Sequence, residues 1–218
     1  KKIITVSEFE KKVILEKCKD AAGKVEVIYN AVDKRFNTGY SAEELKSFRA
    51  KYKLPEVFIL LLGNTAPKKN TAGGIKAYGH YRKITKDPLP LVVADFEAKD
   101  LPHVICPGYI PSNEMPLLYA SSSLLLYPSL RESFGMPVLE AMASGVPVVA
   151  SNTSAIPEVA GDAAILIDPT DYVALAEAMK EILSSTELIN SLKQKGLARA
   201  SRFSWESSAK QLIEIYQS

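Results

Sequence analysis

The sequence contains few of the residues that build metal sites, disulfide frameworks or histidine-assisted nucleophiles. Its 218 residues include only two cysteines, two histidines and one tryptophan. Cys18 and Cys106 are far apart and have no neighbours at metal-ligand spacing, so neither a zinc site nor a disulfide is indicated. Neither histidine accompanies a serine or cysteine in the pattern of a catalytic nucleophile. Because free thiols suit a reducing compartment, we expect a cytoplasmic protein.

Long apolar runs and a strong excess of one charge are also absent. No run approaches the roughly 20 apolar residues of a membrane-spanning helix, and no secretory signal is recognisable. The formal net charge of +2 is too small to indicate a nucleic-acid partner. The lysine pairs Lys1–Lys2 and Lys11–Lys12 suit either solvation or a peripheral contact with the inner face of a membrane, and solvation is the commoner use of such pairs.

Three signatures of phosphate or metal binding are missing as well. No G-x-G-x-x-G follows an apolar run, no P-loop occurs, and the sequence contains no Asp-x-Asp. We therefore expect neither a dinucleotide cofactor nor a bound metal. The apolar content of 47% and the charged content of 24% are those of an ordinary globular protein.

Short apolar runs alternate with helical patterns along the chain, which indicates an α/β fold. Strands are predicted at residues 2–6, 25–29, 57–62, 92–93, 104–105, 124–127, 148–150 and 165–167, and helices at 7–19, 41–54, 72–84, 172–183, 187–200 and 205–216. Capping boxes at Ser7–Glu10 and Ser41–Glu44 begin the first two helices. These units predict a Rossmann-like, doubly wound parallel sheet with ligands at the carboxyl ends of its strands. Extra helices follow at the C-terminus, where we expect Trp205 to pack.

The most informative segment runs from Tyr127 to Gly145. An apolar strand ends at Tyr127, Pro137 suits the first turn of a helix, and Gly145 suits its end. The backbone N–H groups between strand and helix lack intrahelical partners, and with the positive helix end they can receive a phosphate or sugar hydroxyls. These N–H groups belong to Ser133, Phe134, Gly135 and Met136.

Two glutamates flank this turn. Glu132 precedes it and Glu140 lies about one helical turn beyond it, so both carboxylates can approach one ligand and accept hydrogen bonds from its hydroxyls. The alternative is that both are solvated surface charges, with Glu132 paired to Arg131, which is the usual state of charged residues.

The E-x7-E spacing of Glu132 and Glu140 resembles the signature of retaining nucleotide-sugar glycosyltransferases, the family that includes bacterial mannosyltransferases and sucrose synthases. The resemblance extends over nearly all of the chain, because further matches follow in order at residues 27–33, 62–70, 107–110 and 156–164. It implies a GT-B fold, of which this chain would be the C-terminal, donor-binding half.

The resemblance also assigns roles to single residues. It implies that Glu140 holds the ribose hydroxyls and that Glu132 meets the transferred sugar, while the amides of the turn hold sugar and diphosphate. Lys69, assisted by Lys68, would neutralise the departing diphosphate, so that Glu132 and Lys69 are the catalytic residues. The alternative for the two lysines is a solvated basic loop, but their place directly after an apolar strand and Gly63 favours a site.

The rest of the implied donor site comes from Gly63, Tyr109 and Ile110, the last two near the nucleobase. Here the sequence departs from the family, which usually has a glycine and a long helix after the strand at 91–94. In this sequence the corresponding segment, residues 95–102, is short and contains no glycine. The identity of the base therefore stays open.

The same resemblance divides the chain into three parts. Residues 1–35 would be a remnant of the N-terminal domain with the interdomain linker, 36–203 the donor-binding domain and 204–218 a helix that crosses back. The chain begins without methionine, so we expect a fragment or split subunit whose partner is the missing N-terminal domain. Residues 1–29 would then expose apolar surface and a strand edge, and we expect self-association or disorder there. Monodisperse scattering with full hydrogen-exchange protection of residues 1–29 would contradict this.

The predicted function is transfer of a sugar from a nucleoside-diphosphate donor to a hydroxyl acceptor, a glycan or lipid-linked glycan, with retention and without metal. The chain by itself is expected to bind the donor and to transfer little. Two alternatives stay open: a non-hydrolysing nucleotide-sugar epimerase and a non-catalytic nucleotide-sugar binding module.

Overall fold

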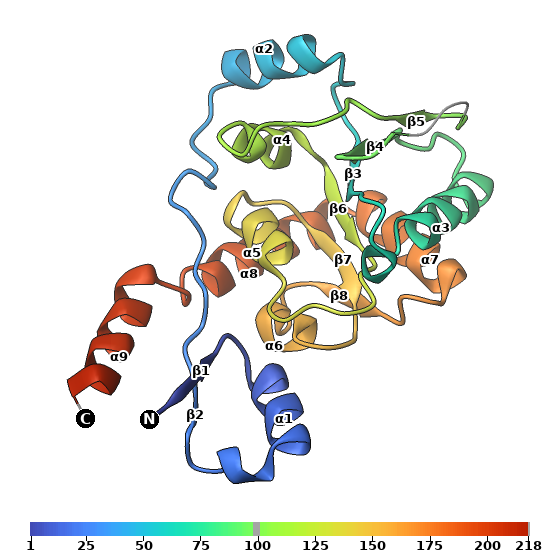
Figure 1. Cartoon of the computed structure of the whole chain (residues 1–218). Coiled ribbons are helices and arrows are strands. Elements are labelled where there is room, and N and C mark those ends of the chain that lie inside the picture. The colour runs from blue at the N-terminus through green and yellow to red at the C-terminus, as the bar shows by residue number, and fades with distance from the viewer. Residues whose placement is uncertain (98–100, 218) are drawn as a thin grey trace.

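The main sheet consists of parallel strands in the order β5–β4–β3–β6–β7–β8, within residues 1–97 and 101–217, which the computed structural model describes. The strands are β3 (Ile59–Leu62), β4 (Leu91–Ala94), β5 (Val104–Ile105), β6 (Leu124–Tyr127), β7 (Val148–Ser151) and β8 (Ile165–Ile167). The chain enters at β3, moves outward to β5 and returns to the middle at β6 (Figure 1). This is the order of a doubly wound Rossmann-like sheet, so the predicted fold class is confirmed. Residues 98–100 of the expected short loop lie outside the described part.

Strands β3 and β6 are neighbours at the point where the strand order reverses. Their register pairs Leu60 with Leu125 and Leu61 with Leu126, so the two strands end at the same edge of the sheet. Open α/β sheets bind ligands outside the carboxyl ends of the strands at such a reversal. The loops that begin at Gly63 and Pro128 therefore leave the sheet side by side.

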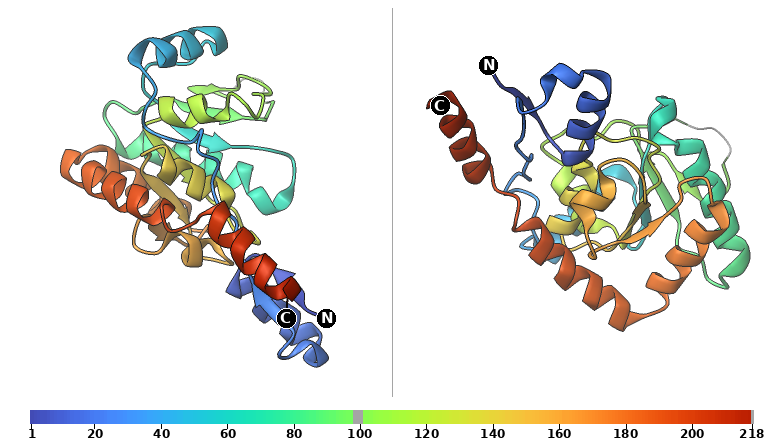
Figure 2. Two further views of the ribbon diagram at one scale, coloured as in Figure 1. Left: turned by 90° about the vertical axis from the view of Figure 1, so that its left-hand side faces the viewer. Right: turned by 90° about the horizontal axis from the view of Figure 1, so that it is seen from below.

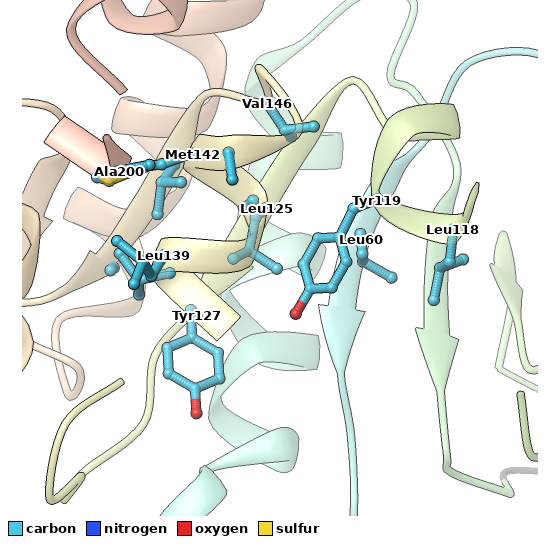
Figure 3. Packing of buried hydrophobic residues seen from close by; sticks show 14 of the residues in the cluster. Leu60, Leu118, Tyr119, Leu125, Tyr127, Leu139, Met142, Val146 and Ala200 are labelled. Carbon is cyan, nitrogen blue, oxygen red and sulfur yellow. The ribbon is translucent and has the colours of Figure 1, made fainter. Parts of the chain in front are cut away.

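Helices cover both faces of this sheet. On one face, α3 (Thr71–Ile84) and α7 (Tyr172–Leu183) pack against the alternate strand residues that include Ile59 and Leu61. On the other face, α4 (Met115–Ser121), α5 (Met136–Ala143) and α6 (Ile156–Ala160) pack against the set that includes Leu60 (Figure 3). Helix α8 (Thr186–Ala200) contributes to both clusters. Burial on both faces is the reason why the strands read as continuous apolar runs.

A smaller unit lies beyond the carboxyl edge of the sheet. It contains β1 (Ile3–Thr5), α1 (Glu8–Lys17), a 3-10 turn at Lys19–Ala21 and β2 (Val25–Val27), with β1 and β2 paired in parallel. From β2 the chain runs along the molecule to α2 (Ala42–Tyr52) at the opposite end, while α9 (Trp205–Gln217) returns to the β1–β2 end (Figures 1 and 2). The division at residues 35 and 203 and the solution behaviour of residues 1–29 stay predictions.

The predicted elements agree with the observed ones to within two residues at each end. The capping box at Ser41 is complete, whereas that at Ser7 is half formed, because the Glu10 carboxylate accepts from Arg131 instead. Trp205 does not pack in the core, because its side chain lies on α9 and is 54% exposed, and its packing at a domain interface stays a prediction. Helix α9 buries none of its described residues, so no core surrounds the indole.

Two glycines of α3 offer a matched test of the packing at the β3 loop. Gly79→Ala is expected to stabilise the fold by about 0.5–1 kcal/mol, because its Cβ would meet nothing within 4 Å and alanine favours the helix. Gly73→Ala is expected to destabilise it by about 1–3 kcal/mol, since its Cβ would overlap the Asn70 side chain, whose amide is fixed by hydrogen bonds to the carbonyls of Pro128 and Pro169. Urea unfolding measures both, and equal shifts in the same direction would contradict the observed packing.

Candidate functional site

Hydrogen bonds join the loop after β3 to the loop after β6. The carbonyl of Lys68 accepts from the backbone N–H of Leu130 (2.7 Å) and from Ser129 Oγ (2.9 Å). Asn70 Nδ2 donates to the carbonyl of Pro128 (3.1 Å). The two loops therefore form one continuous surface at the carboxyl edge of the sheet.

A largely buried ion pair lies at the centre of this surface. Lys69 Nζ is 2.7 Å from Glu132 Oε1, and the two side chains are 20% and 12% exposed. The hydroxyl of Tyr127, the last residue of β6, accepts from Lys69 (2.7 Å) and donates to Glu132 Oε1 (2.7 Å). Ser129 Oγ lies 2.7 Å from the same oxygen and shares its single proton between this carboxylate and the Lys68 carbonyl. Each charge thus has its counter-ion and neutral hydroxyls around it.

These contacts determine the charge states of the cluster. Burial raises the pKa of Glu132, but the hydrogen bonds from Lys69, Tyr127 and Ser129 together with the ammonium charge outweigh it, so the pKa lies below its ordinary value. Burial, and then the neighbouring carboxylate, raise the pKa of Tyr127 far above its ordinary value. Glu132 is therefore a carboxylate at neutral pH, and Tyr127 a neutral phenol.

Glu140 occupies a different environment. It lies on α5, and its Oε2 accepts from the hydroxyl of Tyr119 (2.8 Å), a fully buried residue of α4. Burial raises the pKa of Glu140, and the bond from Tyr119 and the charge of Lys69 offset this only in part. Figure 3 shows the hydroxyls of Tyr119 and Tyr127 projecting to the same side of the labelled core. The core thus supplies the groups that hold both glutamates.

The turn between the glutamates has backbone N–H groups that are free to bind a ligand. Gly135 caps α5 with φ of 106°, a left-handed conformation that favours glycine. Met136 is the first helical residue and Pro137 the second, so Pro137 lies in the first turn as predicted. Among the described residues, the backbone N–H groups of Ser133, Phe134, Gly135 and Met136 donate to no acceptor. Unpaired N–H groups at a helix start are suited to an anion or to hydroxyls.

A cavity of about 220 Å³ opens beside the ion pair. Its walls come from the carboxyl ends of β3 and β4 and from the segment that leads into α4. The lining residues are Leu62, Gly63, Asn64, Lys69, Ala94, Asp95, Tyr109, Ile110 and Met115. Four of the residues assigned from the sequence, Gly63, Lys69, Tyr109 and Ile110, therefore line one cavity. Apolar walls with few polar groups are typical of a small-molecule pocket.

Other residues assigned from the sequence lie at the edge of this site or are exposed. The Lys68 side chain is exposed, and its recorded contacts are those of its carbonyl. Tyr109 is 73% exposed at the rim of the cavity. The alternative pairing of Glu132 with Arg131 is wrong, because Arg131 pairs with Glu10 at 3.0 Å and Glu132 pairs with Lys69.

Several residues of this site were missed at the level of sequence. Tyr119, Tyr127 and Ser129 hold the two glutamates, and Asn64 and Asp95 line the cavity. The sequence did give an indication for Tyr127, because it is the last residue of a predicted buried strand and the loop after that strand was expected to bind a ligand. The sequence gave no such indication for Tyr119, because its contact with Glu140 depends on how α4 packs on α5.

Two negative findings apply to residues 1–97 and 101–217. In that part of the chain no three His, Cys, Asp or Glu side chains gather closely enough to hold a metal. Nor does any helix there combine the length and the apolar character that crossing a bilayer requires. The expected independence from metal stays a prediction.

Comparison with known proteins gives consistent similarities. A family model described as "Glycosyl transferases group 1" matches residues 43–199. O-antigen chain mannosyltransferase B of Escherichia coli is 32% identical and aligns with 100% of this chain and 60% of its own length. The serotype-specific mannosyltransferase WbdA of Escherichia coli is 30% identical over 97% of this chain and 28% of its own.

Solved structures share the fold. A glycosyltransferase from Rickettsia africae superposes with a TM-score of 0.88 at 21% identity, covering 100% of this chain and 63% of that one. Anabaena HepE in complex with UDP and glucose gives 0.85 at 19% identity, with 100% and 63% covered. The chain thus spans 60% of the length of the first mannosyltransferase and less than a third of that of WbdA.

The two glutamates are expected to affect stability in opposite directions. Because the folded pKa of Glu140 is raised, ionisation of its carboxyl removes stability as pH rises through that pKa. Glu140→Gln can still accept from Tyr119, so we expect it to stabilise the fold at pH 7 by about 0.5–2 kcal/mol and by less near pH 4.

Glu132→Gln is the matched variant. The lowered pKa of Glu132 means that its ionised form contributes stability above the unfolded value of 4.5, which is lost as pH falls through the folded value. We expect Glu132→Gln to destabilise the fold at pH 7 by about 1–3 kcal/mol. Denaturant unfolding between pH 4 and 8 measures both variants, and the same sign for both would contradict these environments.

Proposed function

The chain belongs to the family of group 1 glycosyl transferases, and from that premise we propose that it binds the donor of a sugar transfer. The donor would be a nucleoside-diphosphate sugar, and the product a glycoside formed on a hydroxyl acceptor. The similarity to mannosyltransferases supports a hexose as the transferred sugar.

One observation carries the proposal: Lys69 belongs both to the cavity and to the ion pair. Its side chain lines the 220 Å³ pocket, and its ammonium lies 2.7 Å from Glu132. A donor whose nucleoside end occupies the pocket would place its diphosphate near that ammonium. Its sugar would then lie toward Glu132 and the turn that follows.

The nucleoside would be held by shape and by a carboxylate. The ring of the base fits between apolar walls such as Leu62 and Ile110, with Tyr109 at the rim. Glu140 would accept from the ribose hydroxyls, because Tyr119 occupies Oε2 and leaves the other carboxylate oxygen without a recorded partner among the described residues. A hydroxyl that binds a buried carboxylate makes a charge-assisted hydrogen bond.

The reacting end of the donor would meet opposite charges in a fixed arrangement. As the bond from the sugar to the diphosphate breaks, negative charge grows on the leaving group, and Lys69 together with the turn N–H groups would stabilise it. Glu132 would accept from hydroxyls of the sugar and hold the ring in position. Tyr127 would keep Lys69 and Glu132 in place while the ligand enters.

Further parts of the proposal concern the whole reaction. Retention at the anomeric carbon and transfer to a glycan or lipid-linked glycan follow the family resemblance, and Lys69 would replace a metal ion at the diphosphate. A second domain would carry the acceptor, consistent with the 60% of the Escherichia coli relative's length that this chain spans. We place the reaction in the cytoplasm, where the free thiols Cys18 and Cys106 are compatible with reducing conditions, with a peripheral contact at the inner membrane face.

The donor site is tested by nucleotide binding. Lys69→Ala and Glu140→Ala are each expected to weaken binding of uridine, guanosine or adenosine diphosphate by about 1–3 kcal/mol, the usual loss for a charge-assisted hydrogen bond. Titration calorimetry in the presence of EDTA gives the affinity and tests independence from divalent metal. Lys46→Ala and Glu43→Ala remove the same charges from exposed positions of α2 and should bind like the wild type.

Unchanged affinity in both site variants would remove the assignment. An assay with donor and acceptor separates the two alternatives. Release of free nucleotide without dependence on an acceptor would indicate an epimerase. Binding without any turnover when the chain is joined to an intact acceptor domain would indicate a binding module.

A further inference from the structure

The start of α1 is held by a carboxylate from the main domain. Glu158 of α6 accepts from the backbone N–H of Glu8 (2.8 Å) through one oxygen and from that of Phe9 (3.1 Å) through the other. These two N–H groups have no partner within the helix, so the carboxylate supplies their acceptor. The negative charge of Glu158 also interacts favourably with the positive end of the helix dipole. Figures 1 and 2 show α1 beside α6.

A second contact comes from Arg131, just before the turn. Arg131 pairs with Glu10 (3.0 Å), and its guanidinium carbon lies 5.6 Å from the ring centroid of Phe9. Arg131 directly precedes Glu132. The residue next to the proposed sugar-holding carboxylate is therefore attached to α1.

The third contact involves a single hydroxyl with two partners. Ser7 is fully buried. Its Oγ accepts from the backbone N–H of Glu10 (3.1 Å) and donates to the carbonyl of Ser133 (2.7 Å). In a planar trans peptide the C=O of one residue and the N–H of the next point in opposite directions. A bond that holds the carbonyl of Ser133 toward Ser7 therefore turns the N–H of Phe134 away from Ser7.

The Phe134 side chain limits the remaining freedom of this peptide. Its ring is 3% exposed and packs against Tyr29 at 6.2 Å and Phe203 at 5.7 Å between centroids. With the carbonyl bonded on one side and the ring enclosed on the other, the peptide between residues 133 and 134 has one orientation. No other described side chain bonds to this carbonyl.

We propose that Ser7 is a positioning residue for the donor site: its hydroxyl orients the Phe134 N–H toward the phosphate of a nucleoside diphosphate. The inference rests on the proposed function, because it assigns that N–H to the ligand. It links α1, which lies outside the main sheet, to the geometry of the turn that binds the donor. A side chain here must accept and donate at once, which serine and threonine do and glycine does not.

Glycine separates this role from helix capping. Glycine is well tolerated at an N-cap, so Ser7→Gly should fold with a melting temperature only modestly below that of the wild type, the loss reflecting mainly the missing bond to Ser133. We expect Ser7→Gly to raise the Kd for nucleoside diphosphate about three- to tenfold, the effect of one neutral hydrogen bond. Ser7→Thr, which restores the hydroxyl, should bring the Kd back to within about twofold.

Ser41→Gly is the matched control, since Ser41 caps α2 in the same way and has no recorded contact with the turn. Each 218-residue variant is titrated with uridine, guanosine and adenosine diphosphates by calorimetry, and its melting temperature is recorded. Weaker binding in Ser7→Gly alone, with recovery in Ser7→Thr, supports the proposal. Wild-type affinity in Ser7→Gly, or an equal loss in Ser41→Gly, overturns it.

Failure of this inference differs from failure of the proposed function. If the wild type binds nucleotide and loses binding in Lys69→Ala but not in Ser7→Gly, only the role of Ser7 is wrong. If the wild type binds none of the three nucleotides, both are wrong.

Discussion

The ion pair between Lys69 and Glu132 is the interaction on which the rest of the site depends. Both side chains are largely buried, and a buried charge is costly unless a counter-ion and further hydrogen bonds surround it. The two residues are 63 positions apart and meet only because β3 and β6 are neighbours at the reversal of the strand order. The reversal thus creates the edge at which a cation from one loop can face a carboxylate from the other.

Two tyrosines on the buried face of the sheet support this site, because their rings are apolar and their hydroxyls are polar. Tyr127 and Tyr119 place their rings in the core and their hydroxyls on the two glutamates. The same core treats the glutamates differently, because Glu132 has an ammonium beside it and Glu140 has only a phenol as its first partner. Ionising Glu140 therefore costs the fold stability, whereas the partners of Glu132 favour its ionised form.

Much of this was predictable from local sequence. Apolar runs such as 124–127, the turn at Gly135 and the E-x7-E spacing predicted the strands, the helix start and two carboxylates near one edge of a parallel sheet. The cavity could be expected only in outline, through Gly63, Tyr109 and Ile110. The partners Tyr119 and Ser7 could not be predicted, because α4 and α1 approach the turn through packing that no short-range pattern encodes.

What the sequence by itself determined is the set of elements and the loops that follow them, since strand periodicity, capping and turn chemistry act over a few residues. Tertiary structure alone decided which side chains meet. It paired Lys69 with Glu132, turned Arg131 away to Glu10 and left Trp205 exposed on α9. The physical reason is that ion pairing and burial depend on distances across the fold, which the order of residues along the chain does not contain.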